Sequence, residues 1–274
     1  VGTAAAYIHL VGEEYYPLFE AHLSAMLDLK FFPITTQTYP RKQDYQVISA
    51  LAGLGQSLYK LAFDLRLLQS PVIGELAEPF GSKQVGSSAM PFKRNPIRSE
   101  KIDSLARLLA GMPQVAWENA ANSLLERTLD DSANRRTLLP EAFLICDEML
   151  KTMQGTVVGL DVREEIIRQN LADYAPFAAT ERVMMELAKK GADRQEMHEL
   201  LRRLAQEAWA QVFSGKGNPL PDLLQADPVI RGYLQADEIT ALMDARGHIG
   251  LAGNRARWMA GKIREILPET EKKE

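Results

Sequence analysis

A leucine repeat between residues 44 and 69 constrains the fold more than any other stretch of this sequence. The repeat alternates steps of three and four residues through Leu51, Leu54, Leu58, Leu61, Leu65 and Leu68. Because an α-helix has about 3.6 residues per turn, this spacing places the leucines along one narrow stripe of a long helix, which Asp44 can cap. Such a stripe is typical of coiled coils and long helical bundles.

Two further stretches show the same alternation of apolar residues. One contains Ile102, Leu105, Leu109, Met112 and Ala116, and the other contains Leu138, Ala142, Ile145 and Met149. We expect Pro113 to kink or interrupt the first of these helices, and the second helix to begin near Ser132. Three long apolar stripes, with no evident strands, predict an all-α fold whose central domain is a bundle of long helices.

The character of the sequence changes after about Val162. Shorter, more charged helices are expected over residues 163–170, 178–190, 194–214 and 237–246, with Pro and Gly residues between them. We therefore predict two domains. Residues 1–161 form the central helical bundle, and residues 162–274 form a smaller C-terminal helical domain.

The composition excludes several classes of function. Of the 274 residues, 46% are hydrophobic and 25% are charged, and the formal net charge of −4 gives no electrostatic case for a nucleic-acid partner. No apolar run reaches the roughly 18 residues that a membrane-spanning helix needs. The four histidines show no metal-ligand spacing, and the single Cys146 fits a reducing compartment. We expect a cytoplasmic protein without a metal or a membrane partner.

The stretch from Ser70 to Pro96 contains too many prolines and glycines for a regular helix. A loop of this length inside a compact chain is usually either functional or disordered. It ends in G-S-S-A-M-P-F-K-R-N-P at residues 86–96, and five Lys and Arg side chains lie between residues 83 and 101 against one acid, Glu100. A cationic loop with two serines suits an anionic substrate.

The residues of this loop alone do not decide whether its serines act in catalysis or only in a turn. A serine hydroxyl acts as a base only beside a group that stabilises the alkoxide, and Lys93 lies six residues from Ser87. Serines next to a glycine also commonly satisfy hydrogen bonds within a turn. Both interpretations fit the spacing.

A second candidate site lies at residues 126–136, which read E-R-T-L-D-D-S-A-N-R-R. Asp130, Asp131 or Ser132 can cap the helix that follows. Ser132 and Arg136 are four residues apart and share one helix face, so the helix amides, the hydroxyl and the guanidinium can together bind a phosphate, with Arg127 reaching in. A capped helix with solvated arginines explains the same residues.

Residues 86–96 resemble the signature of the fumarase/aspartase superfamily, and residues 126–136 resemble the matching segment of its adenylosuccinate lyase family. Three more segments are similar to that family: Q-T-Y-P-R-K-Q-D at 37–44, P-F-A-A-T-E at 176–181 and D-R-Q-E-M-H-E at 193–199. The resemblance extends from Gly2 to about Ser214. It implies the superfamily's long-helix bundle with a smaller C-terminal helical domain.

The resemblance also implies roles for individual residues. Ser87 would be the general base, Lys93 and Asn95 would surround the substrate carboxylates, and Glu100 would lie behind them. Arg127, Ser132 and Arg136 would contact the nucleotide. The other substrate-binding residues would be Thr3, Tyr39, Arg41, Met90 and Lys101.

The implied reaction is a β-elimination that needs no metal or organic cofactor. Fumarate would leave adenylosuccinate to give AMP, and would leave the succinocarboxamide intermediate of purine biosynthesis to give AICAR. The partner is thus a small succinyl-purine nucleotide. The resemblance further implies a homotetramer whose central helices form one shared bundle and whose active sites draw residues from three subunits.

The sequence departs from the family pattern at its beginning. The family's G-T-Q-A-S motif has a substrate-contacting glutamine where this chain has Ala4. The family's general-acid histidine lies upstream of that motif, so we expect a fragment that lacks the N-terminal domain and is inactive alone. Three alternatives stay open: a non-catalytic nucleotide-binding or assembly relative, a lyase for a different succinyl substrate, and an RNA-binding helical protein, which the net charge disfavours.

Overall fold

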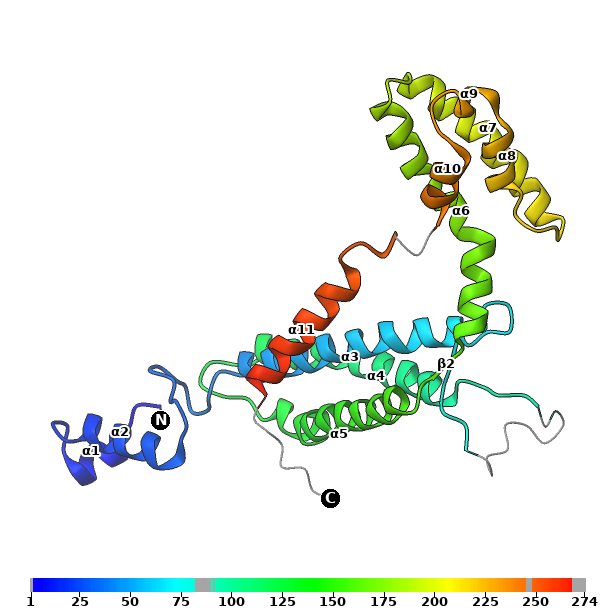
Figure 1. Cartoon of the computed structure of the whole chain (residues 1–274). Helices are drawn as coiled ribbons and strands as arrows, with labels where there is room; N and C mark the ends of the chain where they lie inside the picture. The colour runs from blue at the N-terminus through cyan, green and yellow to red at the C-terminus, as the bar shows by residue number, and fades with distance from the viewer. Residues whose placement is uncertain (1, 82–89, 91, 245–247, 268–274) are drawn as a thin grey trace. The chain divides into compact units, whose positions relative to one another are not determined.

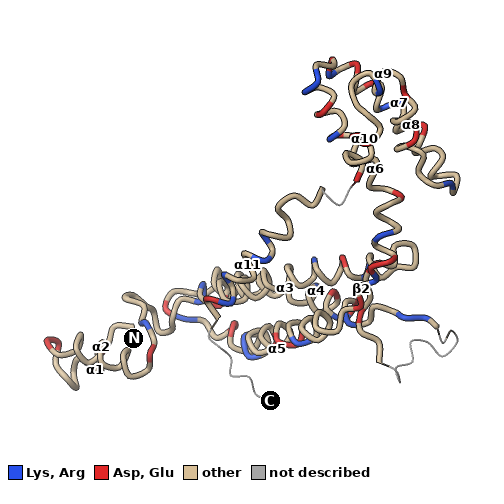
Figure 2. The backbone as a smooth tube through the Cα atoms, viewed as in Figure 1, with Lys and Arg blue, Asp and Glu red and all other residues tan. Residues whose placement is uncertain are grey.

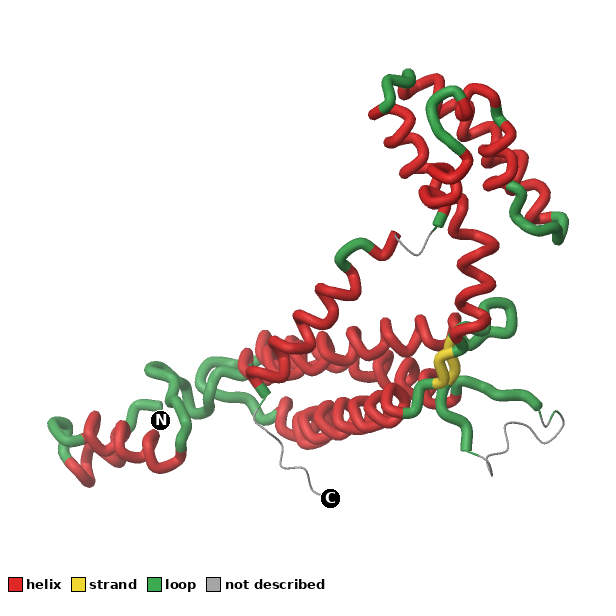
Figure 3. The backbone as a smooth tube through the Cα atoms, in the orientation of Figure 1, coloured by secondary structure: helices red, strands yellow, loops and turns green. Residues whose placement is uncertain are grey.

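A computed structural model describes residues 2–81, 90, 92–244 and 248–267 of the chain. The chain divides into two compact units, Val1–Val162 and Arg163–Glu274. The described residues form helices α1 to α11 and a single two-stranded antiparallel sheet (Figures 1 and 3). The prediction of an all-α fold is therefore confirmed.

The first unit is built around three long helices that lie side by side. Its elements are α1 (Ala5–Val11), α2 (Tyr16–Leu27), α3 (Lys42–Leu68), β1 (Leu76–Ala77), α4 (Ile97–Ala121), α5 (Asp130–Val158) and β2 (Asp161–Val162). Strands β1 and β2 pair through Leu76 with Val162 and Ala77 with Asp161. Lys, Arg, Asp and Glu residues occur along all three long helices (Figure 2).

The core of this unit lies between α3, α4 and α5. Ile48 of α3, Ile102 and Leu109 of α4, and Met149 of α5 are fully buried. Each such side chain contributes about 1.5–3 kcal/mol through its removal from water. Helices α3 and α4 approach closely at Gly55, where a Cβ atom would lie 2.9 Å from Cδ2 of Leu109.

The leucine stripe of α3 is divided between the core and the surface. Leu58 and Leu65 are buried, whereas Leu54 and Leu61 are 40% and 42% exposed. At about 100° per residue, steps of three and four place the leucines on two lines about 60° apart, and only the line of Leu58 and Leu65 faces the core. The exposed half of the stripe is available to another helical surface.

Prolines interrupt the helices less than the sequence predicts. Pro113 lies inside α4, and Pro176 lies inside α6 (Glu164–Lys189), which replaces the two separate helices expected at 163–170 and 178–190. A proline inside a helix removes one backbone hydrogen bond. In both helices, buried residues such as Ala116 and Ala179 continue the packed face beyond the proline and offset that loss.

The second unit contains α6, α7 (Arg194–Phe213), α8 (Leu220–Ala226), α9 (Pro228–Arg231), α10 (Ala236–Met243) and α11 (Ala252–Ile266). Its core includes the buried residues Val183, Leu187, Leu224, Ile230 and Ile239. The Asp193 carboxylate caps α7 by accepting hydrogen bonds from the amides of Gln195 and Glu196. None of the helices in the described part of the chain is both long and apolar enough to cross a bilayer.

Candidate active-site residues

The predicted site residues of the first unit lie at both ends of the helix bundle. Two contacts show that α4 runs antiparallel to α5. Lys101, near the start of α4, contacts Glu148 in the second half of α5, and Asn119, near the end of α4, contacts Asn134 near the start of α5. At about 1.5 Å per residue, the 25 residues of α4 separate these ends by about 36 Å. Lys93, Asn95 and Glu100 belong to one end, and Arg127, Ser132 and Arg136 belong to the other.

At the first end, the Glu78 carboxylate holds the start of α4. This side chain is buried and accepts hydrogen bonds from the backbone amides of Arg98 at 3.0 Å and Ser99 at 2.6 Å. These amides belong to the first turn of α4 and have no partner within the helix. A carboxylate at a helix N-terminus also interacts favourably with the helix dipole.

The Gln69 side chain joins the two sides of the loop at the same end. Its Oε1 atom accepts a hydrogen bond from the Glu78 amide at 2.8 Å, and its Nε2 atom donates to the Arg94 carbonyl at 3.1 Å. Arg94 lies between Lys93 and Asn95 in the sequence. Gln69 and Glu78 therefore set the path of the backbone that carries two of the predicted site residues.

The predicted residues around this loop are mostly exposed. Ser87 lies outside the described residues. Lys93 is exposed, and its amide donates to the carbonyl of Met90, which is 42% exposed. Glu100 is exposed, and the Asn95 carbonyl accepts a hydrogen bond from the Ile97 amide at 2.9 Å.

Two other predicted residues have local partners. Lys101 is ion-paired with Glu148, and this hydrogen bond, together with one from Thr152, lowers the pKa of the Glu148 carboxyl. Thr3 is exposed, and its Oγ1 atom accepts a 3.4 Å hydrogen bond from the Ala5 amide.

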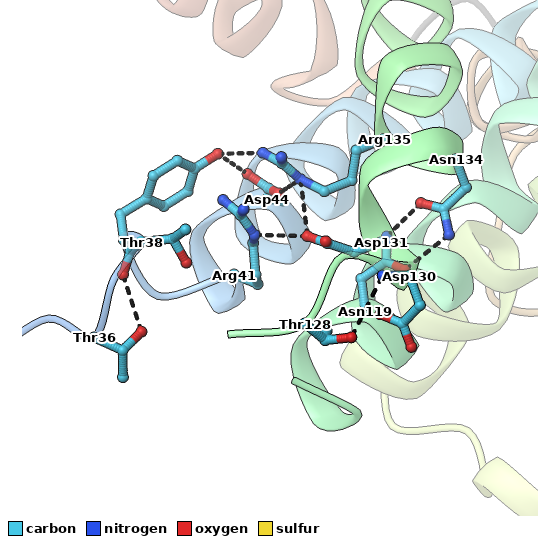
Figure 4. A network of polar contacts seen from close by, with 11 residues as sticks. Thr36, Thr38, Arg41, Asp44, Asn119, Thr128, Asp130, Asp131, Asn134 and Arg135 are labelled. Carbon is cyan, nitrogen blue, oxygen red and sulfur yellow. Dashed lines mark hydrogen bonds and ion pairs between the residues drawn. The ribbon is translucent and has the colours of Figure 1, made fainter. Parts of the chain in front are cut away.

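At the second end, two aspartates and two arginines connect α3 with α5 (Figure 4). Arg41 Nε donates to Asp131 Oδ2 at 2.7 Å, and Arg135 Nε donates to Asp44 Oδ2 at 2.6 Å. The Tyr39 hydroxyl donates to Asp44 Oδ1 and accepts from Arg135 Nη2, both at 2.6 Å. We call these five residues the helix-start network.

The helix-start network is largely shielded from water. The Asp44 and Asp131 side chains are 6% and 4% exposed, and those of Arg41 and Arg135 are 11% and 18% exposed. Burial and the hydrogen bond to Asp44 raise the pKa of the Tyr39 phenol. Burial alone would lower the pKa of Arg135, but the hydrogen bond and charge of Asp44 outweigh it and raise that pKa.

The sequence predicted that Asp44 and Asp131 can each cap a helix, and the structure does not bear this out. Asp44 lies in the first turn of α3 and makes no cap, because Arg41 occupies the N-cap position. Asp131 likewise lies inside α5, whose N-cap is Leu129, and its carboxylate binds Arg41. The prediction that either residue caps a helix was wrong, because an arginine from another element competes successfully for each carboxylate.

The predicted nucleotide-binding residues lie next to this network. Arg127 and Arg136 are exposed, and neither has a hydrogen-bond or ion-pair partner among the described residues. Ser132 is half-buried in the first turn of α5. Sequence reasoning missed Arg135, although its spacing of four residues from Asp131 is a recognisable helical pair.

An open pocket of about 470 Å³ adjoins the helix-start network in the first unit. Tyr39 and Arg41, both predicted to line the substrate site, form part of its wall together with Lys30, Phe31, Phe32 and Gln37. The lining is more apolar than polar, which suits a planar organic group. Within the described residues, no cluster of His, Cys, Asp and Glu side chains could hold a metal ion.

Two family models match this chain. The Lyase model matches residues 1–111, and the model for the adenylosuccinate lyase C-terminus matches residues 176–257. Among curated proteins, the adenylosuccinate lyase of Schizosaccharomyces pombe is 39% identical over 84% of this chain and 47% of its own length. The adenylosuccinate lyase of Pyrococcus horikoshii is 37% identical over 100% of this chain and 57% of its own length. The chain thus spans about half the length of the curated relatives it matches.

Solved structures with this fold belong to related enzymes. The 3-carboxy-cis,cis-muconate lactonizing enzyme from Pseudomonas putida superimposes with a TM-score of 0.71 and 25% identity, over 88% of this chain and 51% of that chain. A fumarate lyase from Mesorhizobium sp. BNC1 also gives a TM-score of 0.71 and 25% identity, over 85% and 49% of the two chains.

Proposed function

Because this chain belongs to the adenylosuccinate lyase family of the fumarase/aspartase superfamily, we propose that it carries much of the active site of a fumarate-releasing lyase. The proposed substrates are adenylosuccinate, which gives AMP, and the succinocarboxamide intermediate of purine biosynthesis, which gives AICAR. Curated relatives named adenylosuccinate lyase support this assignment.

In the proposed mechanism, Ser87 removes a proton from the Cβ atom of the succinyl group. The electron pair moves onto the adjacent carboxylate, and the Cα–N bond then breaks to release fumarate. Lys93 and Asn95 stabilise the charge that develops on the carboxylate, since preorganised donors act most strongly where charge appears in the transition state. A general acid, which we assign to no residue of this chain, protonates the departing nitrogen.

At the other end of the substrate, we propose that Arg127, Ser132 and Arg136 bind the phosphate. Two arginines without polar partners in the described part of the chain, together with the first turn of α5, suit a dianionic group. Tyr39, Arg41 and the adjoining pocket would then lie near the nucleotide. Thr3, Met90 and Lys101 would complete the substrate-binding residues, and Glu100 would lie behind Lys93 and Asn95.

The observation that carries the proposal furthest is the separation of the two groups by the length of α4. A span of about 36 Å is longer than one succinyl nucleotide, so no single copy of the first unit can hold both ends of the substrate. A complete site would combine the start of α4 from one copy with the start of α5 from another. This supports the homotetramer with shared active sites, as do the exposed Leu54 and Leu61 on α3.

The direct test of the reaction measures fumarate release from adenylosuccinate by the complete protein and by its Ser87→Ala variant. We expect release by the unchanged protein and its near-complete loss in the variant. Absence of fumarate release from a folded, oligomeric protein would contradict the proposed activity.

The test of the shared site mixes two inactive variants. Lys93→Ala and Arg136→Ala subunits are unfolded together in a 1:1 ratio, refolded and assayed. If each site takes these residues from different subunits, about one quarter of the sites in randomly mixed oligomers have both intact. Activity should return to about that fraction. Mixed oligomers without activity would contradict the shared site.

Ala4 favours one other candidate, a lyase for a different succinyl substrate. The family motif has glutamine at this position, and loss of a substrate hydrogen bond costs about 1–3 kcal/mol of binding. Under the proposed function, Ala4→Gln should leave the KM for adenylosuccinate unchanged or lower it. A protein that releases fumarate from another succinyl compound but not from adenylosuccinate would support the alternative.

A further inference from the structure

Two adjacent arginines on α5 have opposite environments. The Arg135 side chain is 18% exposed and binds both Asp44 and Tyr39, whereas Arg136 is exposed and has no polar partner among the described residues. Successive residues of an α-helix point about 100° apart, so Arg136 does not share the direction in which Arg135 reaches Asp44 of α3. The structure thus gives two neighbouring arginines of the same helix different environments.

The helix-start network neutralises its own charge. Arg41 and Arg135 contribute two positive charges, and Asp44 and Asp131 contribute two negative charges at hydrogen-bond distance. The positive charge left for a ligand near the start of α5 therefore comes from Arg127 and Arg136 and from the helix dipole. The buried arginines are thus unsuited to bind the phosphate themselves.

The helix-start network also links segments that are far apart in the sequence. Its hydrogen bonds join Tyr39, Arg41 and Asp44 to Asp131 and Arg135 across 90 to 96 residues. The aromatic ring of Tyr39 lies 4.9 Å from the Arg41 guanidinium carbon and 5.7 Å from that of Arg135. These contacts restrict both rotation and sliding of α5 against α3.

Ser132 and Arg136 each directly follow one residue of the helix-start network. Asp131 precedes Ser132, and Arg135 precedes Arg136. The backbone positions of the proposed phosphate ligands are therefore set by anchors one residue away. A binding site needs such supporting contacts because small displacements of its ligands weaken binding.

We propose that Asp44, Asp131 and Arg135 are positioning residues for phosphate recognition, acting through Ser132 and Arg136. This inference rests on the proposed function, since it concerns the phosphate of the same substrate. The helix-start network holds the first turns of α5 in the orientation that binds a phosphate. Its loss weakens recognition of the phosphate rather than the elimination step.

The test compares adenylosuccinate with succinyladenosine, which lacks the phosphate. In the complete protein, Arg135→Gln should raise the KM for adenylosuccinate about tenfold with little change in kcat. The same variant should change kcat/KM for succinyladenosine less than about twofold, because no phosphate is bound. Arg136→Gln, which removes a direct contact, should show the same selectivity. Asp44→Asn should show the same selectivity as Arg135→Gln. Asp64→Asn, in the exposed Lys60–Asp64 pair of α3, is its charge-matched control and should change the kinetics of neither substrate.

The outcomes separate this inference from the proposed function. If Arg136→Gln weakens only the phosphorylated substrate and Arg135→Gln changes neither, the positioning role is overturned and the proposed function stands. If Arg135→Gln weakens both substrates equally, the helix-start network is merely structural and the inference is also overturned. If Arg136→Gln itself shows no phosphate dependence, the proposed phosphate site fails and the positioning role fails with it.

A milder variant covers the case in which Arg135→Gln does not fold. Arg135→Lys retains all four charges and removes the guanidinium fork that binds Asp44 and Tyr39 at the same time. It should raise the KM for adenylosuccinate about twofold to threefold and leave kcat/KM for succinyladenosine unchanged. Equal effects on the two substrates would overturn the inference.

Discussion

The two ends of the three-helix unit are held by different kinds of contact. At the start of α4, the Glu78 carboxylate and the Gln69 amide bind backbone groups. At the starts of α3 and α5, charged side chains bind one another. Contacts to the backbone set the path of the loop and leave Lys93 exposed, whereas the ion pairs also fix side chains. The loop at the proposed carboxylate end is thus held through its backbone, although the Arg66–Asp103 and Lys101–Glu148 ion pairs also lie along the first turns of α4, whereas the proposed phosphate end is held by a side-chain network.

The largest effect should come from breaking the helix-start network. Asp44→Ala leaves the Arg135 guanidinium buried without its carboxylate, which typically costs about 3–5 kcal/mol of the free energy of unfolding. Chemical denaturation would measure the loss. The exposed Asp64→Ala should change stability little, and an equal loss in both variants would contradict the contrast between buried and exposed pairs.

A smaller loss is expected at the other end. Glu78→Ala leaves the amides of Arg98 and Ser99 without their acceptor, which should cost about 2 kcal/mol of the free energy of unfolding. Glu78→Gln keeps one acceptor oxygen and should lose less. The exposed Glu14→Ala serves as control in the same denaturation experiment. A Glu78→Ala variant as stable as the control would show that water replaces the cap.

Alkaline pH should weaken the helix-start network through Tyr39. The folded pKa of this phenol is raised, so its contribution to stability is complete below the unfolded pKa of about 10. That contribution is lost as the pH rises through 10 towards the folded pKa. Stability measured from pH 8 to 11 should therefore fall less steeply for Tyr39→Phe. The exposed Tyr15→Phe should leave the slope unchanged, and two equal slopes would contradict this prediction.

The smallest effect is expected from the exposed pair at the start of α4. Hydrogen bonds from Lys101 and Thr152 lower the pKa of Glu148, so the pair stabilises the fold above the ordinary glutamate pKa of about 4.3 and loses that effect as pH falls. Lys101→Gln should raise the pKa of Glu148 in an NMR titration, with little change in overall stability. An unchanged pKa would show that the pair does not persist in solution.

The long helices were predictable because helical periodicity is a local property. Ile102, Leu109 and Met149, all on the predicted apolar stripes, are buried in the core. The family was likewise readable from residues 86–96 and 126–136. The break expected at Pro176 was wrong, and Pro113 does not end α4, because a rule about one residue does not include the packing of the helix on either side.

The sequence by itself determined the helical class, the apolar stripes, the family and the candidate residues of the site, because spacing and short motifs encode them locally. Only the tertiary structure decided that Asp44 and Asp131 bind arginines rather than cap helices. It also decided that Arg135 is largely shielded and ion-paired, whereas Arg136 is exposed and has no polar partner among the described residues. It further decided that the two candidate groups lie at opposite ends of α4. The physical reason is distance along the chain. Asp44, which binds Arg135, lies 91 residues away, and a local pattern does not determine which of two adjacent arginines reaches it.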